Sequence, residues 1–264
     1  MKVSNTRALV TGASRGLGRS IAEDLARRGA EVARVARNAE SLEALAKELG
    51  GKAYPTDLTD PVAVAGLIDR VQADGPVDIL INNAGLDCVG FLSDTSAKQM
   101  QDVMQVNLLT PMELCRQLMP QLVSRGRGHL VNVSSMGAVS VSPGVTVYAT
   151  SKAGLSHFTA GIRGELRGKP VHTTLVQIGN VKTDMIDNIR EFGPARRTIE
   201  RFEKLHMLPD DLDPAVVASA IVDAIEKEKR HVRLPKSVAP TTMMVEFPRR
   251  MSEVLSIGLD LDTK

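Results

Sequence analysis

The fold is decided by Thr11-Gly12-Ala13-Ser14-Arg15-Gly16-Leu17-Gly18, which stands between a short apolar run at residues 7–11 and a helical pattern at residues 17–28. Glycines at such a junction allow a tight turn and let the backbone approach a pyrophosphate group, whose charge the helix N-terminus stabilises. The spacing is Gly-x-x-x-Gly-x-Gly and differs from the common Gly-x-Gly-x-x-Gly fingerprint. Taken singly, the loop has a second interpretation as a glycine-rich turn without a ligand.

On both sides of this loop the chain alternates short β-branched runs with longer helical patterns, which is typical of βαβ units. Strands are predicted at residues 7–11, 31–36, 52–56, 78–82, 128–134, 171–178 and 231–234. Helices are predicted at residues 17–28, 39–49, 61–73, 97–124, 147–167 and 214–229. Because crossovers between parallel strands are right-handed, the sheet should be doubly wound. We therefore predict an α/β fold: a single doubly wound Rossmann domain over residues 1–264, with a mainly parallel seven-stranded sheet and helices on both faces.

The composition argues against several classes of protein. The chain has 264 residues, 43% apolar and 24% charged, and its 33 Lys and Arg against 31 Asp and Glu leave a net charge of +2. With no Trp, two Tyr and five Phe, it lacks the stacking aromatics and the basic groove that single-stranded nucleic acid needs. Cys88 and Cys115 form no Cys-x-x-Cys pair and the histidines are scattered, which argues against a disulfide framework or a zinc site.

No export signal or membrane-spanning segment is recognisable. The apolar run Ala8-Leu9-Val10 stops at Thr11-Gly12 and is too short for a signal peptide. No stretch approaches the roughly 18 uncharged apolar residues of a spanning helix. Together with the unpaired cysteines, this predicts a cytoplasmic protein.

The predicted helix at residues 97–124 carries more apolar side chains than one core-facing stripe needs. Such an excess indicates burial on more than one side, and one of those sides could be a subunit contact. A homodimer or homotetramer is therefore expected.

Residues 183–210 break the alternation of strands and helices. Ile199, Phe202 and Leu205 recur at a spacing of three, which favours an amphipathic helix. Connections of this length in compact domains usually serve a function, so we predict a lid over the substrate. The alternative is a long surface connection.

Four further motifs follow the glycine loop. Asn82-Asn83-Ala84-Gly85 comes after the fourth predicted strand, Asn107 lies in the long helix, Ser134-Ser135 ends the fifth strand, and Tyr148-Ala149-Thr150-Ser151-Lys152 opens the next helix. In their order and spacing these motifs resemble the short-chain dehydrogenase/reductase family, over about residues 5–185. The resemblance implies an enzyme that transfers a hydride between a nicotinamide cofactor and a carbonyl or alcohol substrate.

Tyr148 and Lys152 are four residues apart on a predicted helix and therefore share a face. A phenol has an unperturbed pKa of about 10, so we expect the Lys152 ammonium group to lower the pKa of Tyr148, which then serves as general acid or base. The resemblance assigns Ser135 to stabilising the substrate oxygen, and Asn107 to holding a water molecule that connects Lys152 to solvent. The serine before Ser135 competes for this role, but adjacent strand residues point to opposite faces. Pro111 supports a disturbed helix at Asn107, because a proline clashes with the carbonyl group four residues earlier.

The end of the second predicted strand indicates which nicotinamide cofactor binds. Ala36 stands where an NAD site would offer a carboxylate to the ribose 2′-OH. Arg15 in the glycine loop and Arg37 after the strand offer two guanidinium groups to a 2′-phosphate. NADP(H) is therefore favoured over NAD(H); the alternative is that Arg15 is a solvated loop cation and Arg37 a helix-entry residue.

The resemblance also implies which residues contact the cofactor. They are Gly12, Ser14, Arg15, Gly16, Leu17 and Gly18 in the loop, Arg37, Asp57, Leu58, Asn83, Ala84, Gly85, Tyr148, Lys152, and finally Gly179, Val181 and Thr183 after the sixth strand. By the same resemblance Asp57 would contact the adenine, but it could equally cap the turn that follows it. Many family members have Pro-Gly where this chain has Ile178-Gly179, so the proline is replaced.

Residues 235–264 depart from the short glycine-rich ending that is common in the family. The segment is apolar and rich in Met, with flanking arginines, and it resembles branches of the family that act on lipophilic alcohols and ketones. It could line an apolar pocket, pack against another subunit or lie on a membrane surface. Packing is the favoured prediction.

The leading prediction is an NADPH-dependent carbonyl reductase, or the reverse alcohol dehydrogenase, acting on a non-polar aldehyde, ketone or acyl compound. A non-catalytic NADP(H)-binding sensor or scaffold is the alternative, although it would not need Ser135, Tyr148 and Lys152. A sugar-nucleotide epimerase ranks last, because such enzymes usually have longer chains and a different glycine spacing. Arg34, inside a predicted central strand, has no predicted role.

Overall fold

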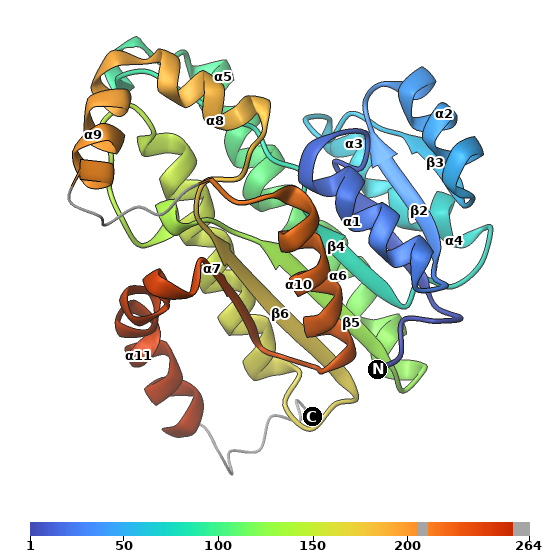
Figure 1. Ribbon diagram of the computed structural model, residues 1–264. Helices are drawn as coiled ribbons and strands as arrows, with labels where there is room; N and C mark the ends of the chain where they lie inside the picture. The colour runs from blue at the N-terminus through green and yellow to red at the C-terminus, as the bar shows by residue number, and fades with distance from the viewer. Residues whose placement is uncertain (205–210, 256–264) are drawn as a thin grey trace.

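Seven parallel strands form the centre of the protein (Figure 1). The computed structural model describes residues 1–204 and 211–255. The strands are β1 Arg7–Thr11, β2 Glu31–Ala36, β3 Lys52–Pro55, β4 Ile79–Asn82, β5 Gly128–Val133, β6 Val171–Ile178 and β7 His231–Leu234. They lie in the order β3-β2-β1-β4-β5-β6-β7, and every neighbouring pair is parallel. The predicted doubly wound Rossmann sheet is confirmed, and it is parallel throughout.

Helices connect the strands. They are α1 Gly16–Arg27, α2 Ala39–Leu49, α3 Pro61–Ala65, α4 Leu67–Gln72, α5 Ala97–Met104, α6 Thr110–Ser124, α7 Thr146–Glu165, α8 Asp184–Glu191, α9 Gly193–Lys204, α10 Pro214–Glu226 and α11 Ala239–Leu255. Gly66 separates α3 from α4, where the sequence predicts one helix, because glycine is a poor helix former. The predicted helix at residues 97–124 is interrupted by a π-helix at Gln105–Leu109. The predicted lid contains two helices, α8 and α9, and its residues 205–210 lie outside the described residues.

Helices cover both faces of the sheet. Ile21 of α1 and Ile221 of α10 are fully buried in one apolar cluster. Ile68 of α4 and Leu118 of α6 are fully buried in the other. Since side chains alternate along a strand, Leu9 of β1 belongs to the second cluster and both its neighbours belong to the first. Burial on both faces explains why the strands read as continuous apolar runs.

Apolar side chains remain exposed around α5 and α6. Met100, Leu109 and Met112 are 42%, 48% and 38% exposed in the single chain. The opposite side of α6 is buried through Leu114, Leu118 and Leu122. The subunit contact expected on this helix stays a prediction.

The C-terminal helix α11 is attached to β7, the last strand of the sheet (Figure 1). The buried Glu246 of α11 accepts a hydrogen bond from Arg233 Nη2 of β7 at 2.7 Å, and its Oε2 lies 3.3 Å from His231 Nε2. Met243, Met244, Val245, Phe247 and Met251 are exposed on the helix. Among the described residues, none of the helices is long and apolar enough to cross a bilayer.

Arg34 is fully buried in β2 and braces the turn before β3. Its Nη1 donates to the carbonyl group of Gly50 and lies 3.5 Å from the carbonyl oxygen of Val32. Gly51 has a φ of +86°, and a Cβ there would lie 2.3 Å from the Val32 carbonyl oxygen and 2.9 Å from Arg34 Nη1. The turn therefore packs directly on the guanidinium group, and burial lowers the pKa of Arg34. This role is structural.

His129 in β5 makes the stability of the fold depend on pH. Its Nε2 lies 2.7 Å from Thr174 Oγ1, and burial lowers the pKa of the imidazole from 6.5 to about 3. The folded protein keeps the ring neutral, whereas the unfolded chain takes up a proton below pH ~6.5. We expect the free energy of unfolding to be insensitive to this group above pH ~6.5, and to fall by up to about 1.4 kcal/mol per pH unit as the pH drops below that value.

Urea denaturation of the wild type and of His129→Gln at a series of pH values checks this expectation. Gln can still donate to the Thr174 hydroxyl but does not titrate, so the variant should lose stability less steeply below pH ~6.5. Equal slopes in the two proteins would contradict the assignment.

Candidate active site

Tyr148 and Lys152 lie one turn apart at the start of α7. Lys152 is buried, and its Nζ lies 5.9 Å from the centre of the Tyr148 ring. The ammonium group donates a hydrogen bond to the carbonyl oxygen of Val133, the last residue of β5, at 2.9 Å. The carboxyl end of β5 therefore holds the Lys152 side chain beside the tyrosine.

The two serines after β5 point to different partners. Ser135 Oγ accepts from Gly137 N at 3.0 Å, and a Cβ on Gly137 would lie 3.4 Å from Ser135 Oγ and 3.6 Å from Tyr148 Cε1. Ser134 is 2% exposed; its Oγ donates to the Lys152 carbonyl oxygen at 3.0 Å and lies 2.8 Å from Ser156 Oγ. Ser135 thus faces the phenol, while Ser134 fastens β5 to α7.

The pKa of Tyr148 is shifted in the opposite direction from that predicted from the sequence. Burial raises the pKa of Tyr148, the hydrogen bond from Ser135 partly opposes this, and the nearby Asp87 carboxylate adds to the rise. Burial also lowers the pKa of Lys152 to about 8. The expected lowering of the Tyr148 pKa is therefore wrong for the protein alone, because burial disfavours the phenolate.

Asn107 lies in the π-helix between α5 and α6, where the sequence predicts a disturbed helix. Its Oδ1 accepts from Leu86 N at 2.8 Å, and its Nδ2 donates to Leu86 O at 2.9 Å and to Ser151 Oγ at 3.0 Å. Ser151 Oγ in turn donates to the carbonyl oxygen of Tyr148 at 2.6 Å. The Asn107 amide thus connects the loop after β4 to the first turn of α7. The water molecule that Asn107 is expected to hold stays a prediction.

The glycine loop packs against the loop after β4, at the point where the strand order reverses between β1 and β4. Thr11 Oγ1 accepts from Asn83 N and from Ala84 N, both at 3.0 Å. Gly12 has a φ of +68°, and a Cβ there would lie 2.9 Å from the Ala84 Cα. A Cβ on Gly18 would lie 2.1 Å from the Gly12 carbonyl oxygen. Dinucleotides bind at such a switch point in open parallel sheets.

The loop after β4 also approaches the catalytic residues. A Cβ on Gly85 would lie 3.5 Å from both Asn107 Oδ1 and Lys152 Nζ. The glycine loop, the Asn83 to Gly85 loop and the start of α7 therefore meet at the carboxyl edge of the sheet.

The predicted phosphate-binding arginines have different surroundings. Arg15 and Asp184, the first residue of α8, form an ion pair although both side chains are more than 70% exposed. Arg37 is exposed after β2, and its charge contributes to lowering the pKa of Asp57. The larger cause is Thr59, whose backbone and hydroxyl groups both donate to Asp57 Oδ1. The turn-capping interpretation of Asp57 is confirmed, and its contact with adenine stays a prediction.

The other predicted cofactor residues line the same edge of the sheet. Ser14 is half-buried in the glycine loop and Leu17 is buried. Leu58 is buried too, and its carbonyl oxygen accepts from Thr110 Oγ1 at 3.0 Å. These positions agree with the predicted site, although the contacts themselves stay predictions.

The segment after β6 lies opposite the glycine loop. Gly179 N donates to the carbonyl oxygen of Leu234 at 2.8 Å, and Val181 forms a parallel bridge with Leu212. Thr183 Cγ2 would lie 3.2 Å from a Cβ on Gly16. Thr183 therefore stands across the glycine loop, and its contact with the nicotinamide stays a prediction.

Sequence reasoning missed a group of side chains that attach α8 to the loop after β4. Asn188 Nδ2 of α8 donates to Asp87 Oδ2 at 3.2 Å. The ring of Phe192, directly after α8, stands edge-on to Phe91, with centroids 5.3 Å apart and an interplanar angle of 78°. The available signal was the position of Asp87 at the carboxyl end of a parallel strand, where ligands bind.

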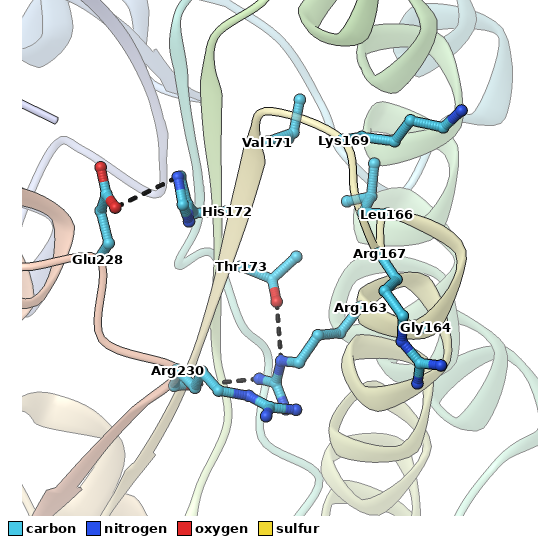
Figure 2. A pocket seen from close by; sticks show the side chains of 10 residues that line it. All are labelled: Arg163, Gly164, Leu166, Arg167, Lys169, Val171, His172, Thr173, Glu228 and Arg230. Atoms are coloured by element: carbon cyan, nitrogen blue, oxygen red, sulfur yellow. Dashed lines mark hydrogen bonds and ion pairs between the residues drawn. The ribbon is translucent and has the colours of Figure 1, made fainter. Parts of the chain in front are cut away.

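A cavity of about 330 Å³ lies at the amino end of β6, at the opposite end of the strand from the catalytic residues (Figure 2). Its polar side chains bond to one another: Arg163 Nε donates to Thr173 Oγ1 at 2.9 Å, and His172 Nε2 lies 3.4 Å from Glu228 Oε2. Because the catalytic residues follow the carboxyl ends of the strands, this cavity is not part of the candidate active site.

The fold and this group of residues define a nicotinamide-dependent oxidoreductase. The family model described as short chain dehydrogenase matches residues 6–193, and the chain belongs to the short-chain dehydrogenase/reductase family. Among its relatives is the ketoacyl reductase HetN of Nostoc sp., 36% identical over 231 residues, which cover 85% of this chain and 76% of the relative.

Solved structures are similar over nearly the whole chain. A short-chain dehydrogenase from Streptomyces avermitilis is 30% identical with a TM-score of 0.79, covering 98% of this chain and 100% of the other. A metagenomic short-chain oxidoreductase in complex with NADP is 28% identical with a TM-score of 0.71, covering 89% and 98%.

Proposed function

We propose that the protein reduces a ketone, aldehyde or acyl compound with NADPH, using Tyr148 as the proton donor. The observation that carries this proposal is the grouping of three side chains: a Cβ on Gly137 would lie 3.4 Å from Ser135 Oγ and 3.6 Å from Tyr148 Cε1, and Lys152 Nζ lies 5.9 Å from the centre of the Tyr148 ring. When bound, the nicotinamide supplies the hydride. A carbonyl oxygen placed between the two hydroxyl groups accepts a hydrogen bond from Ser135 and the proton from Tyr148.

The charge state of the site supports the reductive direction. Burial raises the pKa of Tyr148, so the phenol is protonated near neutral pH and available as an acid. The pKa of Lys152 is about 8, so below that pH its side chain is mainly an ammonium group and can return a proton to the phenolate. Asn107 would hold the water molecule that links Lys152 to solvent.

A non-catalytic sensor is not favoured, because such a protein needs no Ser135, Tyr148 and Lys152 in contact. The relative HetN is described as a ketoacyl reductase, which agrees with a carbonyl substrate. Apolar side chains favour a substrate with an apolar body: the Met185 Cε lies 3.8 Å from the Cβ position of Gly85, and Phe91 and Phe192 stack on each other.

The function is tested by following NADPH oxidation over aldehydes, ketones and acyl thioesters graded by chain length and ring size. Turnover of at least one class supports the proposal. If the protein bound NADPH but turned over none of these compounds, the non-catalytic sensor would be favoured instead.

We also propose that NADP(H) is preferred to NAD(H), since Ala36 at the end of β2 offers no carboxylate, Arg37 follows it directly, and Arg15 is exposed in the glycine loop. Replacing both arginines by Ala should raise the KM for NADPH at least roughly tenfold, because each charge-assisted hydrogen bond contributes about 1.5 kcal/mol or more. The KM for NADH should change far less. Initial-rate kinetics with both cofactors provide the measurement.

Arg19→Ala is the matched control for this double variant. Arg19 is an exposed cation on α1 whose Nε donates to Glu23 at 2.7 Å, away from the strand end. Its removal should leave both KM values close to those of the wild type. Equal effects of the double variant on NADPH and NADH would reject the preference.

The exposed Met100, Leu109 and Met112 support our further proposal that the protein forms a homodimer or homotetramer through the α5–α6 face. Sedimentation velocity of the wild type and of Met112→Lys distinguishes an oligomer held by this face from one that is not.

A further inference from the structure

Asp87 is held beside the catalytic tyrosine by its neighbours in the chain. Both backbone groups of Leu86 are bonded to the Asn107 amide, which also bonds Ser151 one turn along α7. Three residues after Asp87, Gly90 N donates to the carbonyl oxygen of Gly144 at 2.9 Å, two residues before α7 begins. The segment that carries Asp87 is therefore attached at both ends to the region around the first turn of α7.

The carboxylate of Asp87 has no cationic partner in the described part of the chain. It is half-buried, its recorded side-chain contact is the 3.2 Å hydrogen bond from Asn188, and it belongs to none of the ion pairs there. Its negative charge nevertheless reaches the Tyr148 phenol and disfavours the phenolate. A negative charge in this position also affects the electrostatic energy of a substrate that is hydrogen-bonded to Tyr148 and Ser135.

This charge has a consequence for carbonyl reduction. Negative charge develops on the substrate oxygen as the hydride arrives, and groups near it are normally donors or cations. A carboxylate nearby works against that development unless a positive charge offsets it. Because none of the described cations forms an ion pair with Asp87, a cation on the substrate would gain an attraction there that a neutral substrate lacks.

The surroundings of Asp87 restrict the kind of cation. Phe91 and Phe192 stack edge-to-face beside the same loop, and a Cβ on Gly144 would lie 2.4 Å from the Phe192 ring. Phe91 follows Asp87 by four residues, and Phe192 follows its partner Asn188 by four. Aromatic rings in the neighbourhood of a carboxylate suit an ammonium group that carries alkyl substituents, because the rings attract the charge and contact the methyl groups. A primary ammonium group, which is strongly hydrated, fits such surroundings less well.

We infer that Asp87 is a specificity-determining residue that selects carbonyl substrates bearing an alkylated ammonium group. The inference rests on the proposed carbonyl reductase function and narrows its substrate class. The competing explanation is that Asp87 only attaches α8 to the loop after β4, through Asn188.

Two isosteric aldehydes test the inference: 4-(trimethylammonio)benzaldehyde and the neutral 4-tert-butylbenzaldehyde, each also as the meta isomer. Asp87→Asn removes the charge but can still accept from Asn188, whereas Asn188→Ala removes the contact with α8 and keeps the charge. In Asp87→Asn, the ratio of kcat/KM for the cationic over the neutral aldehyde should fall at least roughly tenfold, with the value for the neutral aldehyde raised. In Asn188→Ala the two aldehydes should change by the same factor. Comparing ratios cancels the different intrinsic reactivities of the two aldehydes.

A binding measurement keeps the test independent of turnover. The corresponding benzyl alcohols cannot react with the NADPH-loaded wild type, so calorimetry reports their affinities directly. The cationic alcohol should bind at least roughly tenfold more tightly than the neutral one, and Asp87→Asn should abolish the difference.

The outcomes separate the two proposals. Turnover of neutral aldehydes without a preference for the cation, or equal effects of Asp87→Asn on both aldehydes, would overturn the role of Asp87 and leave the carbonyl reductase standing. Selective binding of the cationic alcohol without turnover of any carbonyl compound would uphold Asp87 as the selecting residue and overturn the proposed reaction.

Discussion

Tyr148→Phe is expected to lower kcat about a thousandfold while leaving NADPH binding intact. The substitution removes the hydroxyl group that would donate the proton, and it keeps the ring whose centre lies 5.9 Å from Lys152 Nζ. The glycine loop and the loop after β4 are untouched. Stopped-flow reduction of an active carbonyl compound and fluorescence titration with NADPH measure the two quantities separately.

Tyr54→Phe is the matched control, because Tyr54 and Tyr148 are the two tyrosines of the chain. The Tyr54 hydroxyl accepts from Arg7 Nη2 at 2.8 Å and donates to Asp74 Oδ2 at 2.6 Å, far along the sheet at β3. Losing these bonds should cost about 1–2 kcal/mol of stability and leave turnover near that of the wild type. Unchanged turnover in Tyr148→Phe would refute its role as proton donor.

Gly18→Ala is expected to destabilise the fold by roughly 3 kcal/mol and to abolish binding of the cofactor. The added methyl group would lie 2.1 Å from the Gly12 carbonyl oxygen and 2.4 Å from Asn83 Nδ2. The first of these is a backbone atom, so α1 or the glycine loop must move. Either movement separates the helix N-terminus from the position that a pyrophosphate would take.

Urea denaturation and NADPH titration check this expectation, with Gly161→Ala as the control. Gly161 is an exposed glycine of α7, and a Cβ there would meet no atom within 4 Å. Ala at that position should stabilise the protein by about 0.5–1 kcal/mol, since glycine is unfavourable inside a helix. If Gly18→Ala were as stable as Gly161→Ala and still bound NADPH, close packing would not be the reason that position 18 requires glycine.

Much of the fold was predictable because the burial of each strand and helix determines a local pattern of apolar residues in the sequence. A strand buried on both faces reads as an apolar run, and β1 and β6 were located to the residue in this way. The positions of Ser135, Tyr148 and Lys152 were predictable for a similar reason, since their spacing fixes them relative to one strand and one helix. The structure brings these three side chains together.

The remaining features depend on contacts between distant segments, which no local pattern records. Asp87 and Asn188 meet across 101 positions, and Arg15 and Asp184 across 169. The direction of the Tyr148 pKa shift also escaped prediction, because it depends on burial by several elements together. A helical spacing indicates that two side chains share a face, but not how much water surrounds them.

The all-parallel sheet also sets the order in which the protein can assemble during synthesis. β2 pairs with both β1 and β3 within the first 55 residues, so this half of the sheet can begin to form early. The partner of β1 on its other side comes much later, because Ala8 pairs with Ile79. Such distant pairings must close long loops before they gain any contact, and this makes them slow. The catalytic residues, beginning at Asn107, therefore leave the ribosome after β1, β2 and β3, which have the first opportunity to pair.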